Sequence, residues 1–98
     1  MTPQDMDALV KATQGKLQVT FTYIKKDTGE TVIHTGGIYE LGGVTKGGNP
    51  CVWMWDTALN NSIRALLVEN IIGIQVLDIP FSPPQPWPIK INGQPIGY

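Results

Sequence analysis

Apolar side chains near the N-terminus recur at the spacing of a helix. Thr2 precedes Pro3, which is typical of a helix start because the hydroxyl can accept a free backbone N–H and the proline has none to satisfy. Gly15 supplies a stop. The pattern predicts a helix over residues 3–14, with the helical spacing set by Met6, Leu9, Val10 and Thr13.

From residue 17 the apolar positions alternate with polar ones, which is the period of a half-buried strand. Residues 26–29 have the composition of a tight turn, and the β-branched run 31–33 follows directly. We therefore expect a hairpin around residues 26–29. The core face of its first strand would hold Leu17, Val19, Phe21 and Tyr23.

Four further short strands are expected later in the chain. Gly36 and Gly37 precede the first of them and predict a flexible break. The second and third are apolar enough to be central in the sheet or covered on both faces. Pro80 ends the fourth, because proline has no N–H for a ladder. These strands span residues 38–41, 51–55, 62–68 and 73–79.

One helix with five or six short strands predicts an all-β fold, a small barrel over residues 1–80. Residues 81–98 form a proline-rich C-terminal arm, with a small hairpin around Asn92-Gly93. The arm either lies back on the domain or reaches a second subunit or another protein. The candidate partner-binding residues are Phe81, Trp87, Ile89, Ile91 and Tyr98.

Composition narrows the class of protein. The chain has 98 residues, 42% of them hydrophobic and only 15% charged, with a formal net charge of −1. This balance argues against a strongly basic nucleic-acid-binding surface, and so few charges favour a homo-oligomer or a protein partner. Cys51 alone cannot form an internal disulfide, and we see neither a signal peptide nor an apolar run of about 20 residues. We expect a cytoplasmic protein without a membrane span.

Residues 5–79 resemble the WYL domain, an SH3-like β-barrel found mostly in bacterial transcription regulators and defence-associated proteins. The order and spacing of several segments carry the likeness, although the tripeptide that names the family would fall at Pro50-Cys51-Val52, where no residue matches. The segments are Val19–Tyr23, Asp27–Glu30, His34–Leu41, Cys51–Asp56, Ser62–Ile71 and Ile74–Leu77.

The resemblance implies a ligand site. In WYL domains an arginine helps line a site thought to bind nucleotides or nucleic acid, and Arg64 is similar in position. A second basic position of the family would fall at Asn70. The resemblance therefore implies a stand-alone, non-enzymatic module that binds an anionic ligand, a nucleotide or a nucleic-acid end, in a regulatory or defence-related role.

Arg64 is the strongest candidate from the residues themselves. It is the only cation between Lys46 and Lys90, and its guanidinium suits a phosphate or carboxylate bidentately. The alternative is an internal ion pair with an acidic side chain. On the first interpretation, Arg64→Ala weakens ligand binding by about 1.5–3 kcal/mol and leaves the fold intact. The acids considered for the ion pair are Glu69, Asp56 and Glu40.

Four other residues are candidates for ligand binding. Tyr23 is either a core residue with its hydroxyl at the rim or a donor to the ligand. His34 either donates to a phosphate or is a satisfied structural histidine. Trp53 and Trp55 share one face of a strand and form either a stacking platform for a base or part of the core.

No enzymatic chemistry emerges from the pattern. No nucleophile and base stand in a recognised spacing, and the sequence has no phosphate-binding loop, dinucleotide motif or zinc-ligand cluster. We expect no catalytic activity, no cofactor and no metal. The alternative to ligand binding is a phage-type accessory, inhibitor or assembly protein that acts through contacts of the barrel and the C-terminal arm.

Overall fold

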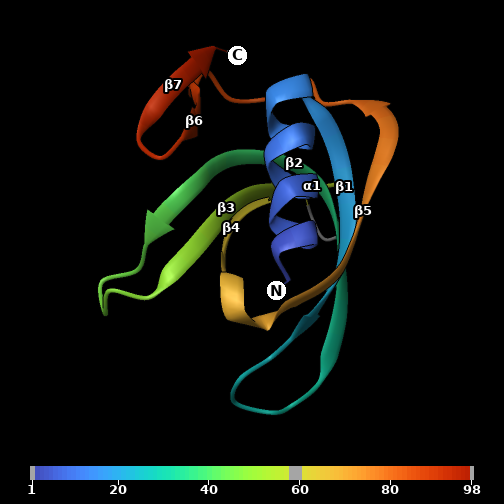
Figure 1. Cartoon of the computed structure of the whole chain (residues 1–98), viewed down its shortest axis with the longest axis vertical. Helices are drawn as coiled ribbons and strands as arrows, with labels where there is room; N and C mark the ends of the chain where they lie inside the picture. The colour runs from blue at the N-terminus through green and yellow to red at the C-terminus, as the bar shows by residue number, and fades with distance from the viewer. Residues whose placement is uncertain (1, 58–60, 98) are drawn as a thin grey trace.

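A computed structural model describes residues 2–57 and 61–97 of the chain. It contains one α-helix and, within that part, seven strands (Figure 1). No helix there is long and apolar enough to cross a membrane. The elements are α1 (Pro3–Gly15), β1 (Leu17–Ile24), β2 (Thr31–Val44), β3 (Pro50–Asp56), β4 (Ser62–Leu67), the 3₁₀ turn η1 (Val68–Asn70), β5 (Ile71–Pro80), β6 (Ile89–Ile91) and β7 (Gln94–Gly97).

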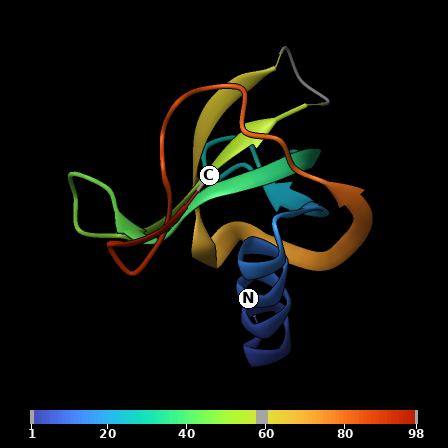
Figure 2. The same ribbon diagram turned by 90° about the horizontal axis from the view of Figure 1, so that it is seen from above.

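The predicted helix is confirmed and is one residue longer than expected. Thr2 caps it: its hydroxyl accepts the Asp5 backbone N–H at 3.1 Å, and the Asp5 carboxylate accepts the Thr2 N–H. The helix ends where Lys16 adopts a left-handed conformation with φ of 55°. Leu9 and Ala12 are fully buried, so α1 packs against one side of the curved strands (Figure 2).

The main sheet has the strand order β4-β3-β2-β1-β5, with every neighbouring pair antiparallel. A flat sheet would place β4 and β5 about 19 Å apart, four spacings of about 4.8 Å. The link through η1 spans at most about 14 Å between Leu67 and Ile71 even when fully extended. The sheet must therefore curl, and this confirms the small barrel-like all-β fold with an N-terminal helix.

The interior of the curl holds the main core. Apolar side chains from α1 and from the inward faces of β1 to β5 meet there. In β1 the alternation predicted from the sequence is observed, with Val19 and Phe21 buried. The fully or nearly fully buried members are Leu9, Ala12, Val19, Phe21, Ile38, Leu41, Val52, Met54, Leu66 and Ile71.

The expected flexible break at Gly36 and Gly37 is wrong. Both residues lie inside β2, which runs without interruption for 14 residues. A Cβ on Gly36 would lie 1.8 Å from the backbone oxygen of Trp55, and one on Gly37 would lie 2.0 Å from the Phe81 ring. Glycine is needed here for close approach between chain segments, not for a turn.

Of the two alternatives expected for residues 62–68, a central place in the sheet is wrong, and partial cover on both faces is observed. β4 pairs only with β3 and is an end strand of the main path, whereas β3 is central. Its two faces are each partly covered, because Leu66 packs in the interior core and Ile63 packs on the outside of the sheet. Val68 belongs to η1 and not to the strand.

The C-terminal arm lies back on the domain, one of the two interpretations left open by the sequence. β6 pairs in parallel with β2, and β6 and β7 form the expected hairpin. Asn92 and Gly93 have φ of 51° and 79°, as a type I′ turn requires. The arm covers the outer face of β2 and β3 and builds a second core from Tyr39, Phe81 and Ile89, with Trp55 and Ile63 packed against it.

Tyr39→Phe is expected to loosen the arm. The buried Tyr39 hydroxyl donates to the Gln85 carbonyl at 3.2 Å and accepts the Gln85 N–H at 3.0 Å. Losing both hydrogen bonds should lower the free energy of unfolding by about 1–2 kcal/mol, measured by chemical denaturation. Faster hydrogen exchange at the Gln85 amide should accompany the loss, and an unchanged exchange rate there would contradict the assignment.

The same variant should also change how the free energy of unfolding depends on pH in the alkaline range. Burial raises the pKa of Tyr39 above its ordinary value of 10.0, and the hydrogen bond to Gln85 acts in the opposite direction. A group with a raised folded pKa stabilises the fold below its unfolded pKa and loses that contribution as the pH rises. The native chain should therefore lose stability above pH 10 more steeply than the phenylalanine variant.

Candidate functional site

A cavity of about 490 Å³ opens between β1, β2 and β4. Its polar lining consists of a hydroxyl, an ammonium, an imidazole and a guanidinium group, and none of the described residues that line it is acidic. Such a set of donors suits a negatively charged ligand. The lining residues are Tyr23, Lys25, Val32, His34, Ile63, Arg64, Ala65 and Leu66.

His34 reaches this cavity from β2 and is held by Asp56 of β3. The strand register places Asp56 opposite Gly36, so that His34 is a diagonal neighbour on the same face. The His34 Nδ1 and the Asp56 Oδ2 lie 2.5 Å apart, and both side chains are almost completely buried. Since an ionised carboxylate only accepts, Nδ1–H donates to Asp56, and Nε2 is the ring nitrogen left for other contacts.

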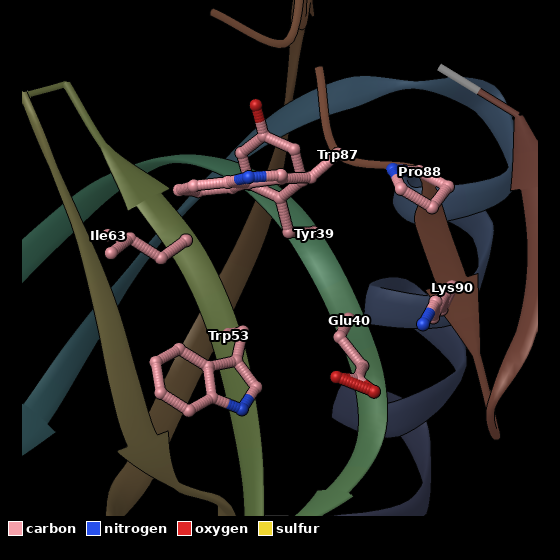
Figure 3. A pocket seen from close by; sticks show the side chains of 7 residues that line it. All are labelled: Tyr39, Glu40, Trp53, Ile63, Trp87, Pro88 and Lys90. Carbon is pink, nitrogen blue, oxygen red and sulfur yellow. The ribbon is translucent and has the colours of Figure 1, made fainter. Parts of the chain in front are cut away.

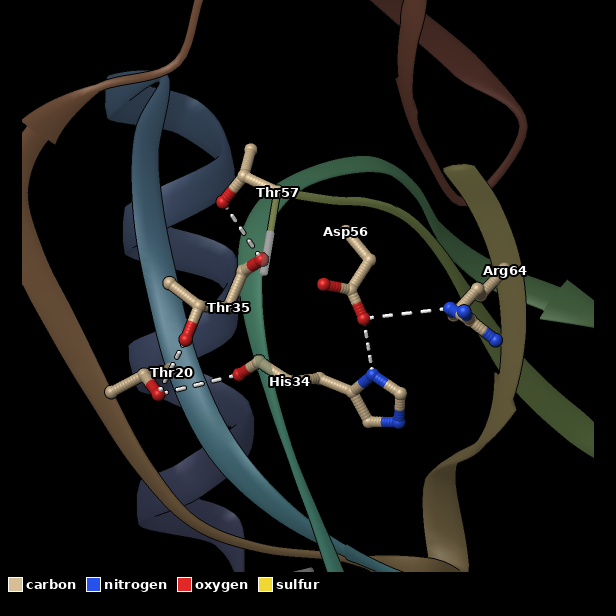
Figure 4. A network of polar contacts seen from close by, with 6 residues as sticks. All are labelled: Thr20, His34, Thr35, Asp56, Thr57 and Arg64. Atoms are coloured by element: carbon tan, nitrogen blue, oxygen red, sulfur yellow. Dashed lines mark hydrogen bonds and ion pairs between the residues drawn. The ribbon is translucent and has the colours of Figure 1, made fainter. Parts of the chain in front are cut away.

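Arg64 reaches the same carboxylate from the opposite strand. Met54 is its register partner, which makes Asp56 a diagonal neighbour across β3 and β4. The Arg64 Nε lies 3.5 Å from the Asp56 Oδ2, and 35% of the arginine side chain remains exposed. Figure 4 shows the Asp56 carboxylate between the imidazole and the guanidinium group. Asp56 therefore orients both the imidazole of His34 and the guanidinium group of Arg64.

The ion-pair interpretation of Arg64 is thus realised with one of the three acids considered. Glu69 instead lies 3.6 Å from Lys26 on the surface, and Glu40 lines a different cleft. Ligand contact and the internal ion pair do not exclude each other, because a guanidinium has five donors. Removing Arg64 is not structurally silent, however, since it takes away the guanidinium group whose Nε lies 3.5 Å from the fully buried Asp56 carboxylate.

Tyr23 packs over the histidine. Its ring meets the His34 imidazole edge-on, with centroids 5.7 Å apart, and its hydroxyl accepts the Leu67 backbone N–H at 3.1 Å. On the other side of the strand, the Thr20 hydroxyl donates to the His34 carbonyl at 3.3 Å (Figure 4). His34 is therefore held both through its imidazole ring and through its backbone carbonyl.

The structure brings together three of the five predicted ligand-binding residues and separates the other two. Tyr23, His34 and Arg64 line one cavity. Trp53 and Trp55 project from the other face of β3, where Trp55 packs on the second core. Trp53 lines a second cleft of about 370 Å³ on that outer face (Figure 3). Ligand binding by all five stays a prediction.

The residues predicted to bind a partner are divided by burial. Phe81 and Ile89 are buried in the second core of their own chain, so they are not available to a partner while the arm is docked. Ile91 packs against the interior core, whereas Trp87 is 43% exposed. Tyr98 lies outside the described residues. A partner surface made of all these side chains would require the arm to leave the sheet.

Sequence reasoning missed Lys25, and it named Asp56 only as one of three acids that could pair with Arg64, without its contact with His34. A signal for Asp56 existed: it follows Val52 and Met54 at intervals of two, and this spacing places a carboxylate on the core face of β3. A buried carboxylate requires a partner. Lys25 follows β1 directly and had no comparable signal, because it is one of two adjacent lysines at a turn.

Comparisons with known proteins concern the fold. No protein-family model matches the chain, and no curated protein matches it. Among solved structures, the chain is similar to proteasome accessory factor B/C (PafBC) of Arthrobacter aurescens, with a TM-score of 0.73 and 24% sequence identity. The match covers 87% of this chain and 13% of that chain. At this identity the likeness shows that the chain shares its fold with part of that protein, which is consistent with the fold expected from the resemblance to the WYL domain.

Proposed function

We propose that the protein is a non-enzymatic regulatory module that binds an anionic ligand, a nucleotide or a nucleic-acid end, in the cavity between β1, β2 and β4. The observation that carries this proposal is the convergence of Lys25, His34 and Arg64 on a cavity with no acidic lining residue among those described. The fold likeness to part of a regulator is consistent with it.

A terminal phosphate fits this donor set best. Arg64 can bind phosphate oxygens through a planar fork, and Lys25 adds a point charge at the exposed rim. His34 Nε2 accepts when the ring is neutral and donates when it is protonated, so it can pair with a P–OH group or with a P–O⁻ group. A phosphate monoester, which occurs in both states near neutral pH, can satisfy either form.

The test is binding of a 5′-phosphorylated thymidine hexamer, measured by calorimetry at fixed ionic strength. Arg64→Ala should weaken binding by about 1.5–3 kcal/mol, or roughly 10- to 150-fold. Lys46→Ala removes one positive charge from an exposed turn outside the cavity and should change affinity little. Each variant is checked for folding by circular dichroism, because Arg64 also contacts Asp56.

Three results would contradict the proposal. The first is equal affinity for the 5′-hydroxyl hexamer, since this would show that the terminal phosphate is not recognised. The second is unchanged affinity in a folded Arg64→Ala protein. The third is an equal loss in Lys46→Ala, which would reduce the effect to general electrostatics. Thymidine 5′-monophosphate, used alongside, distinguishes a free nucleotide from a strand end.

A further inference from the structure

The cleft on the outer face of β2 and β3 has the form of a second ligand site. Its volume of about 370 Å³ lies in the range of small-molecule sites. Five of its seven lining residues are aromatic or aliphatic, and the other two are Glu40 and Lys90. The apolar lining residues are Tyr39, Trp53, Ile63, Trp87 and Pro88.

Two tryptophans at this cleft keep much of their surface in water. Trp53 from β3 is 39% exposed, and Trp87 from the arm is 43% exposed. They come from segments 34 residues apart in sequence and meet at one cleft only because the arm docks on β2 (Figure 3). The Trp87 ring contacts Tyr39, with centroids 5.4 Å apart and planes at 63°, so that each indole can offer only its exposed part to a planar ring.

The two charged residues give the cleft a hydrogen-bonding edge. Glu40 and Lys90 are register partners on β2 and β6, so an acceptor and a donor stand side by side. Figure 3 shows the Glu40 carboxylate and the Lys90 amine projecting into the same space. Among the described residues, neither side chain has an ion-pair partner within 4.0 Å. Both groups can therefore pair with a bound molecule.

From this arrangement we infer that the outer cleft binds a guanine base. A guanine presents two adjacent N–H donors, N1–H and the 2-amino group, which one carboxylate accepts together. Its neighbouring O6 accepts from an ammonium group. Glu40 and Lys90 match this donor-donor-acceptor edge, while Trp53 and Trp87 supply the stacking surface. Adenine and cytosine offer a carboxylate only one donor group on that edge.

The site is independent of the anion cavity. Ile63 borders both sites from β4, but Arg64, Lys25 and His34 line only the inner cavity, and the two tryptophans line only the outer cleft. Guanosine has no phosphate, so its binding reports on the outer cleft alone. Failure of guanosine to bind therefore leaves the proposal for the phosphate site untouched.

The experiment follows the three tryptophan indole N–H signals by NMR during titration with guanosine, and with inosine as the matched ligand that lacks the 2-amino group. The signals of Trp53 and Trp87 should shift more than that of Trp55, which packs on the second core. Guanosine should bind about five- to tenfold more tightly than inosine. Trp53→Leu should weaken guanosine binding about tenfold.

Glu40→Gln tests the recognition itself. An amide oxygen accepts only part of what the carboxylate accepts, and its NH₂ group opposes the guanine donors. This variant should bind guanosine about tenfold more weakly and lose the preference over inosine. Asp78→Asn removes a negative charge at an exposed position of β5. This control should keep both the affinity for guanosine and the preference for guanosine over inosine.

Several results would overturn the inference. No shift at millimolar guanosine excludes the site. Equal affinities for guanosine and inosine in the native chain reduce it to unspecific stacking. Signals of Trp53 and Trp87 that move with protein concentration and not with guanosine would assign the cleft to a second copy of the chain.

Discussion

Gly36→Ala is expected to destabilise the protein by about 4 kcal/mol or more, a large share of the stability of a domain of this size. The added Cβ would lie 1.8 Å from the Trp55 backbone oxygen and 2.9 Å from its carbonyl carbon. Both obstacles are backbone atoms of the central strand β3, so no side-chain rotation relieves the contact. Chemical denaturation with far-UV circular dichroism measures the loss.

Gly43→Ala is the matched control for this prediction. It lies in the same strand, and its added Cβ would find its nearest neighbour, the Trp53 Cδ1, at 3.5 Å, an ordinary contact distance. Its φ does not lie in the left-handed region, so alanine adds no backbone strain there. We expect a change of at most about 1 kcal/mol. Equal losses in the two variants would show that any side chain weakens β2 and would refute the steric explanation.

Asp56→Ala is expected to lower the free energy of unfolding by about 3–5 kcal/mol, the usual cost of breaking a buried ion pair from one side. The carboxylate is fully buried and lies between His34 and Arg64. Without it, the buried imidazole N–H loses its acceptor, and the Arg64 guanidinium loses the carboxylate that lies 3.5 Å from its Nε. Thermal and chemical unfolding of the purified variant measure the effect.

Two further variants separate charge from shape and position at this site. Asp56→Asn keeps an oxygen that can accept from His34 but presents an NH₂ group or a neutral oxygen to Arg64, so an intermediate loss is expected. Asp78→Ala removes a carboxylate from an exposed position and should change stability by no more than about 0.5 kcal/mol. If Asp56→Ala were as mild as Asp78→Ala, the shared carboxylate would have no structural role.

The local elements were predictable because their signals are local. The cap at Thr2 and the period of two in β1 depend only on neighbouring residues, and both elements were predicted nearly to their ends. The Asn92-Gly93 turn was predicted for the same reason, since both positions need a positive φ. Gly36 was interpreted wrongly because its requirement comes from Trp55, 19 residues away.

The candidate site was predictable only in part. Arg64 stood out as an isolated cation within an apolar region, and Tyr23 and His34 were named with it. Their meeting at one cavity depends on strand register, which also brings in Asp56 and Lys25. The stacking platform predicted for Trp53 and Trp55 was divided, because the arm packs against Trp55 and brings Trp87 to the cleft that Trp53 lines.

The sequence by itself determined the class of fold, the helix with its cap, the first strand, the C-terminal hairpin and the isolation of Arg64, since periodicity, caps and turns act over a few residues. Only the tertiary structure decided which groups face one another. The curl of the sheet and the register of β2, β3 and β4 place the buried Asp56 carboxylate against both His34 and Arg64. Docking of the arm on β2 then creates the outer cleft, because parallel pairing of β6 sets Lys90 beside Glu40. These contacts join residues far apart in the chain, and their energies depend on packing that no local pattern encodes.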